Sequence, residues 1–380
     1  MNTKENQYFR QLDGFRFISI TAVMLSHFAE KSFLDRLPLG FGVLFFFVLS
    51  SFLITRILLT AKNNNEITGT GNLFSLRQFY IRRFLRIFPI YYLLIIFMYI
   101  INWHPCREIV GYLLTYTTNL KIASGTDAGS FNHLWSLAVE EQFYIFFPFL
   151  IFFINIRHIL NMLFVFTAVG LVGRALLYLH NPSYIPYSNF NTISCLDSLG
   201  IGGLLAYLSV YKEDLLKRII ANRWLFAGAA AAFLLTMVFS YSLRSGVERY
   251  SFYCLVLMRF LFNVMSFWIL GVAVTFGYRG LMRSFLENKF VVYVGRISYG
   301  MYLYHLFVPI IMKIVLGHFR MTTLLNSEVG WAILLRTVIY VGVTIIIASV
   351  SWYLIEKPLN NIKKYFSYNK KPALVAANTR

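Results

Sequence analysis

Long apolar runs, separated by short polar connections, recur along almost the whole chain. A helix needs about 20 mainly apolar residues to cross a bilayer. One apolar run, at 107–120, is too short and too polar to cross the bilayer, and we expect it to form a re-entrant or interfacial helix. The pattern predicts an all-α integral membrane protein, a bundle of about ten transmembrane helices. The ten candidate spans are 13–30, 41–60, 87–104, 134–154, 158–179, 195–210, 223–242, 255–277, 296–317 and 331–355.

The composition supports a membrane protein. The chain is 58% hydrophobic, has a mean hydropathy of +0.62, and only 13% of its 380 residues are charged. Soluble domains average about 25% charged residues. The net charge of +19 is scattered between the apolar runs, which indicates contact with the lipid bilayer and not with nucleic acid.

The basic residues also predict the topology. Most of the 35 Lys and Arg residues fall in alternate connections, on the side that holds both chain ends. Because positive loops stay in the cytoplasm, we expect both termini to be cytoplasmic. Residues 1–358 are interpreted as the transmembrane domain, and 359–380 as a basic cytoplasmic tail.

The first run contains two ionisable residues, Arg16 and His27, that lipid does not favour. They lie eleven positions apart, so on a helix they share one face and are separated by about 16 Å along the axis. A polar cavity through a helix bundle would explain both. The alternative is that Arg16 reaches the headgroups while His27 is a hydrogen-bonded interior histidine.

Arg83 and Arg86 lie three residues apart and therefore on one helical face. Such a pair can hold the phosphates of a cytosolic cofactor such as coenzyme A. Arginines that anchor a helix at the membrane surface give the same pattern, and taken alone the two interpretations are equally good.

Two adjacent carboxylates, Glu140 and Glu141, interrupt the apolar run 134–154. Adjacent helical residues point about 100° apart, so the two cannot both face one site. Glu140 shares its face with His133, Ser136 and Tyr144. We therefore predict that Glu140 faces a cavity, where a carboxylate can hold a histidine tautomer, and that Glu141 is structural.

Two further segments carry polar residues in apolar surroundings. Asp197 stands at the start of its run, where it either faces an acceptor site or caps the helix, and the cap is slightly favoured. Ser298, Tyr302 and His305 follow helical spacing, so they lie on one face of the ninth predicted span.

Seven motifs together resemble acyltransferase family 3, membrane enzymes that O-acylate bacterial surface polysaccharides and other acceptors. The chain departs from the family pattern at Ser51, where glycine is common, and at Cys195, where a basic residue is usual. The resemblance runs from residue 12 to 358, so we expect the minimal form of the family without an appended domain. The motifs are LDGFR with His27 after ten intervening residues, FFFVLSSFLI, RRFLRIFPIYY, HLWSLAVEEQFY, LDSLGIGGLLAY, ISYGMYLYH and EKP.

The resemblance implies a function and a set of site residues. It implies a multi-pass protein of a bacterial cell (inner) membrane that uses acyl-CoA, expected to be acetyl-CoA, as donor and an extracytoplasmic glycan as acceptor. His27 would be the general base or proton relay, which suits a histidine near its normal pKa. The expected roles are catalysis for His27, Glu140 and Arg16, donor binding for Arg83, Arg86, Ser298, Tyr302 and His305, and acceptor binding for Asp197, His133 and Trp135.

Other chemistry has less support in the sequence. The seven histidines show no metal-ligand spacing, so no metal and no permanently bound cofactor is expected. There is no GxSxG motif for a serine nucleophile. A proton-coupled transporter or flippase of a glycan or small molecule remains the alternative, because buried ionisable groups also line such pathways. A purely structural scaffold would not need matched ionisable residues.

Overall fold

A computed structural model describes residues 8–30, 32–180, 189–242, 252–318 and 329–368. Within these ranges the chain forms helices and turns and no strand, which confirms the all-α prediction. Eight helices, some extended by an adjoining turn, are long and apolar enough to cross a membrane, and a bent pair raises the number to nine. The eight are α2 (Gly42–Thr68), α3 (Asn72–Ile100), α6 (Leu134–Phe153), α7 (Ile156–His180), α9 (Leu196–Tyr211), α11 (Arg223–Ser242), α13 (Arg259–Thr275) and α18 (Gly330–Ser351).

All ten predicted spans fall on helices, and eight or nine of these are long and apolar enough by themselves to cross a membrane. The first predicted span forms helix α1 (Arg10–Phe28), but its polar and charged residues leave it outside the eight apolar helices. The ninth predicted span is two helices, α15 (Lys289–Tyr304) and α16 (Phe307–His318), which meet at a bend of 68°. Helix α3 begins well before residue 87 and continues through Pro89, so that proline does not start the helix.

Glycines let helix α9 pack closely between α2 and α7. A Cβ on Gly202 would lie 2.2 Å from the Val48 carbonyl oxygen of α2, and one on Gly200 would lie 2.4 Å from Thr167 of α7. The departure from the family pattern at Ser51 lies at the same contact, where its hydroxyl donates to the Leu199 carbonyl at 2.5 Å. The small residues of the sequence therefore bring backbones together, as expected for membrane helices.

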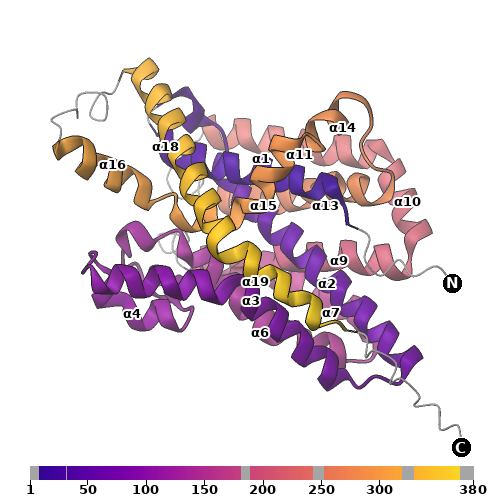
Figure 1. Ribbon diagram of the computed structural model, residues 1–380. Helices are drawn as coiled ribbons and strands as arrows, with labels where there is room; N and C mark the ends of the chain where they lie inside the picture. Colours follow the sequence, from indigo (N-terminus) through magenta and orange to yellow (C-terminus); the bar gives the residue numbers. More distant parts are fainter. Residues whose placement is uncertain (1–7, 31, 181–188, 243–251, 319–328, 369–380) are drawn as a thin grey trace, which may run out of the picture.

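Helices α1 and α15 cross near the centre of the bundle (Figure 1). A Cβ on Gly295 of α15 would lie only 2.0 Å from the Asp13 carbonyl oxygen of α1. This contact places the polar residues of α1 beside those of α15, although more than 270 positions separate them in the sequence.

The run predicted to be too short to cross forms two short helices, α4 (Cys106–Leu114) and α5 (Thr118–Ala123). Helix α4 packs beside α3, where Tyr91 and Tyr92 donate to its backbone at 2.8 and 2.9 Å, and α5 packs against α6. Helix α18 continues through a turn of π-helix into α19 (Lys357–Ile362), which contacts α3 (Figure 1). Arg82 of α3 donates to two carbonyls just after α19, those of Lys363 and Phe366.

Candidate active site

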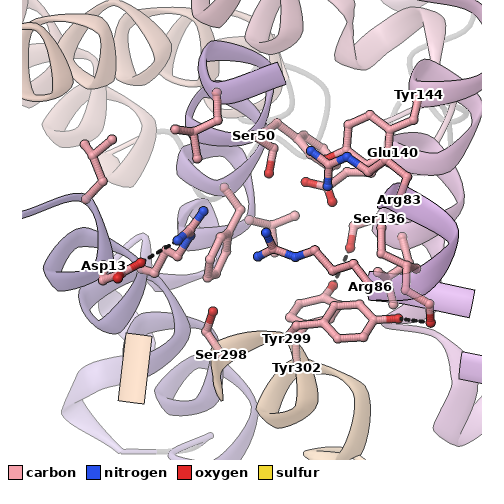
Figure 2. A pocket seen from close by; sticks show the side chains of 18 of the residues that line it. Asp13, Ser50, Arg83, Arg86, Ser136, Glu140, Tyr144, Ser298, Tyr299 and Tyr302 are labelled. Atoms are coloured by element: carbon pink, nitrogen blue, oxygen red, sulfur yellow. Dashed lines mark hydrogen bonds and ion pairs between the residues drawn. The ribbon is translucent and has the colours of Figure 1, made fainter. Parts of the chain in front are cut away.

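A cavity of about 370 Å³ lies between helices α1, α2, α3, α6 and α15. This volume is at the lower end of the range for small-molecule sites, about 300–1,000 Å³. One part of the wall is apolar, with Phe46 and Phe47 among its residues. The polar part, much of it labelled in Figure 2, is formed by Asp13, Arg16, Ser50, Arg83, Arg86, Ser136, Glu140, Tyr144, Ser298, Tyr299 and Tyr302.

Arg16 is held in place by a residue that the sequence analysis did not select. The Asp13 carboxylate accepts a hydrogen bond from Arg16 at 2.5 Å, and only 2% of the Asp13 side chain is exposed. Asp13 also accepts from the Tyr8 hydroxyl and lies 3.7 Å from Arg296 of α15. An aspartate three residues before an arginine lies on the same helical face, so the LDGFR motif already contained this signal.

Arg83, Arg86 and Glu140 meet across the cavity, as Figure 2 shows. The Arg83 guanidinium lies 4.4 Å from the centre of the Tyr144 ring. The Glu140 carboxylate accepts hydrogen bonds from Ser50 and Tyr144, and its charged neighbours are the two arginines. The carboxylate therefore lies among hydroxyl donors near two positive charges, and it does not hold a histidine tautomer as we had expected.

The helical-face argument for the two glutamates is confirmed. Ser136, Glu140 and Tyr144 all line the cavity, whereas Glu141 does not. Glu141 is 3% exposed, and its Oε1 has no hydrogen-bond partner among the described residues.

The Ser136–Tyr302 pair marks one end of the cavity. The two hydroxyls are 2.5 Å apart, and Tyr302 also donates to the His133 carbonyl oxygen at 2.8 Å. Ser298 and Tyr302 line the cavity as predicted from their common face, while His305 lies just after α15 ends.

Three histidines gather next to this end, outside the cavity lining. The ring centre of His305 lies 5.2 Å from that of His27 and 4.8 Å from that of His133. His305 and His133 are 0% and 3% exposed, whereas the side chain of His27 is exposed. Arg16 and His27, placed on one helical face by the sequence, thus belong to adjacent sites. The described residues contain no group of three or more ligands placed to hold a metal ion.

Asp197 lies away from the cavity. Arg174 of α7 donates to both of its carboxylate oxygens, at 2.9 and 2.6 Å, and both side chains are 0% exposed. The slightly favoured helix-cap interpretation was wrong, because the N-cap position of α9 belongs to Cys195. Arg259 donates to the Cys195 sulfur at 3.0 Å, so an arginine from α13 supplies positive charge where the family usually has a basic residue.

Trp135 also lies outside the cavity lining. Its ring packs edge-on against Phe47 and Phe190, with centres 5.8 and 5.0 Å apart. The structure therefore brings Arg16, Arg83, Arg86, Glu140, Ser298 and Tyr302 into one cavity, and His27, His133 and His305 into a cluster beside it.

This arrangement has the features of a site for an anionic group. Three arginines line one cavity. Their planar guanidinium groups can donate two parallel hydrogen bonds to a phosphate group. Polar hydroxyls and an adjoining histidine cluster lie at one end, where proton transfer from a second reactant is chemically feasible.

Comparison with known proteins finds an O-acetyltransferase among the proteins to which this chain is similar. The chain is 26% identical to the O-acetyltransferase OatA of Staphylococcus aureus strains NCTC 8325 and COL, over 326 residues that cover 79% of this chain. A second protein of strain COL, provisionally named an O-acetyltransferase, is 26% identical over 352 residues. The chain spans about half the length of these relatives, 50% and 51%.

No solved structure matches the chain significantly. Residues 9–354 match the family model described as an acyltransferase domain. This match covers nearly the whole described helical bundle, including the cavity and the three histidines. The chain therefore belongs to acyltransferase family 3.

Proposed function

We propose that the protein is a membrane O-acyltransferase. It moves an acyl group, expected to be acetyl, from cytosolic acyl-CoA to a hydroxyl of a surface polysaccharide or related glycan. The observation that carries this proposal is the adjacency of a three-arginine cavity to a cluster that contains an exposed histidine. The name of the OatA relatives, O-acetyltransferase, favours acetyl as the transferred group.

The donor would occupy the cavity. Coenzyme A carries phosphates, and Arg83 and Arg86 are the cavity residues best suited to bind them, because guanidinium groups pair with phosphate oxygens through two hydrogen bonds. The topology expected from loop charge puts this side towards the cytoplasm. The thioester would then lie towards the Ser136–Tyr302 end, which adjoins the histidines.

The acceptor hydroxyl would approach from the side on which His27 is exposed. His27 removes its proton while the hydroxyl oxygen bonds to the thioester carbon, and the C–S bond then breaks. The departing coenzyme A thiolate takes up a proton, so the products are the acyl ester and free coenzyme A.

The test uses proteoliposomes of known orientation, with labelled acetyl-CoA added on one face and a glycan acceptor on the other. Labelled acceptor should form only when the donor meets the face predicted to be cytoplasmic. Arg83→Ala combined with Arg86→Ala should raise the KM for acetyl-CoA by at least about tenfold, because each charge-assisted hydrogen bond contributes about 1.5–3 kcal/mol.

Arg77→Ala is the matched control, since Arg77 lies on the same helix, is exposed and does not line the cavity. Its KM should equal that of the wild type. Net movement of a glycan across the bilayer without formation of acetylated product would instead support the transporter alternative, and transfer that requires donor on the other face would contradict the topology.

A further inference from the structure

The hydrogen bonds of the two buried histidines define their tautomers. His305 Nδ1 lies 2.7 Å from the Tyr302 carbonyl oxygen, and His133 Nε2 lies 3.1 Å from that of Leu303. A carbonyl oxygen only accepts, so each of these ring nitrogens carries the proton. In the neutral rings, His305 Nε2 and His133 Nδ1 therefore hold lone pairs.

These two lone pairs lack partners. Neither nitrogen has a hydrogen-bond partner among the described residues, and both are buried. They cannot satisfy each other, because a hydrogen bond needs a donor. A buried acceptor without a donor costs about 1–3 kcal/mol, so a donor beside this cluster is favoured.

His27 is the neighbouring group that can supply this donor. Its ring centre lies 5.2 Å from that of His305, and the ring planes are inclined by 44°. No hydrogen bond joins the two rings in the structure. Imidazole rings joined by an N–H···N hydrogen bond nevertheless have centres about 5 Å apart, so a rotation of the exposed His27 side chain could form this bond without moving either helix. Glu140, the carboxylate that the sequence suggested as a histidine partner, instead accepts hydrogen bonds from Ser50 and Tyr144 in the cavity.

We propose that His305 is a positioning residue for His27, an inference that rests on the proposed function. Once the His27 side chain has rotated, His305 Nε2 accepts the N–H of His27, which fixes one tautomer of His27 and leaves its other nitrogen free to act as the base. The Tyr302 carbonyl oxygen in turn holds the His305 ring through a hydrogen bond. The series of hydrogen bonds therefore runs from the Tyr302 carbonyl to His305, then to His27 and finally to the acceptor hydroxyl. A neutral imidazole thus takes the place that a carboxylate occupies in a serine hydrolase triad.

This assignment changes the role that the sequence suggested for His305. Spacing placed it on the face of Ser298 and Tyr302, as part of the donor site. His305 keeps helical backbone angles, however, and lies beyond Tyr302, outside the cavity lining and beside His27 and His133.

The direct test measures histidine ring nitrogens by NMR in the detergent-solubilised protein labelled with ¹⁵N-histidine. The His27 signals are assigned by their loss in His27→Gln. We expect one predominant His27 tautomer and a scalar coupling between a His27 nitrogen and His305 Nε2 across the hydrogen bond. A mixture of His27 tautomers with no such coupling would overturn the proposal, and this readout does not depend on any activity.

Kinetics of two substitutions test the consequence. His305→Phe removes the acceptor and should lower kcat for acyl transfer by about 10- to 100-fold, less than the about 10²- to 10⁴-fold contribution of a general base itself. The KM for acetyl-CoA should not change, because the donor site is separate. His305→Gln keeps an acceptor oxygen and a donor N–H, so it should recover most of the lost kcat.

Phe307→Leu serves as the packing control. The Phe307 ring is buried and its centre lies 5.7 Å from that of His133, but it carries no nitrogen. It should leave both the His27 tautomer and kcat nearly unchanged. In a His27→Ala background, His305→Phe should cause no further loss of residual turnover, since residues that act as a unit are not additive. Additive losses of kcat would refute the positioning role of His305. If the wild type showed the scalar coupling between His27 and His305 but transferred no acyl group, only the proposed function would be refuted.

Discussion

The Asp197–Arg174 pair offers a test that separates a structural role from a substrate-binding role. The sequence suggested acceptor binding or a helix cap for Asp197, and the structure places its carboxylate against Arg174, with both side chains fully buried. Asn263 donates a further hydrogen bond to the carboxylate at 2.9 Å. We predict that Asp197→Asn mainly destabilises the fold.

The magnitude follows from what the amide lacks. An asparagine side chain has one acceptor oxygen, and its NH₂ group must face either Arg174 or Asn263, both of which are donors. The guanidinium of Arg174 is then buried without a counter-charge. Removal of one partner from a buried ion pair costs about 3–5 kcal/mol, which corresponds to a fall in Tm of about 5–15 °C.

The assay is thermal unfolding of the purified protein in detergent. Asp214→Asn is the control, because it makes the same chemical change on an exposed residue of α10 (Glu213–Ala221) and should leave Tm unchanged. Asp197→Asn combined with Arg174→Gln should recover part of the loss, since no unpaired charge remains buried. A wild-type Tm for Asp197→Asn, together with a raised KM for the glycan acceptor, would refute this reasoning and restore the acceptor-binding role.

Three further predictions concern the site and its framework. His27→Ala should abolish acyl transfer while the protein still accumulates in the membrane, because the exposed side chain contributes little packing; near-normal turnover would exclude His27 from the mechanism. Glu140→Gln should lower kcat by orders of magnitude, whereas Glu141→Gln should act mainly on thermal stability, and equal kinetic defects at equal yield would contradict the helical-face argument. Gly202→Ala should lower the free energy of unfolding by about 1–3 kcal/mol, because the new Cβ would clash with the Val48 carbonyl. Gly228→Ala is the control, since its Cβ would meet nothing within 4 Å. Equal stabilities of the two variants would argue against the close approach of α2 and α9.

Helical periodicity identified much of the site because it depends only on local geometry. The common face of Ser136, Glu140 and Tyr144, and the exclusion of Glu141 from it, follow from 3.6 residues per turn. The common face of Ser298 and Tyr302 was predicted in the same way. The class of protein was equally accessible, because the length and composition of apolar runs reflect the thickness of the bilayer.

The partners of these residues depended on contacts between helices, which a periodic pattern does not encode. Asp197 was found to pair with Arg174 only once α7 and α9 were packed together. Likewise, the glycine contact between α1 and α15 brings Arg16 close to Ser298 in one cavity. The hydropathy pattern likewise did not show the 68° bend after α15.

The histidine cluster gives the clearest division between sequence and tertiary structure. Helical spacing placed His27 on the face of Arg16 and His305 on the face of Ser298 and Tyr302, while His133 directly precedes its own apolar segment. That these three rings meet was decided by the tertiary structure, because α1, α6 and α15 converge at one end of the cavity. The physical reason is that the direction of a side chain is fixed within its own helix, whereas its neighbour is chosen by how helices distant in sequence pack.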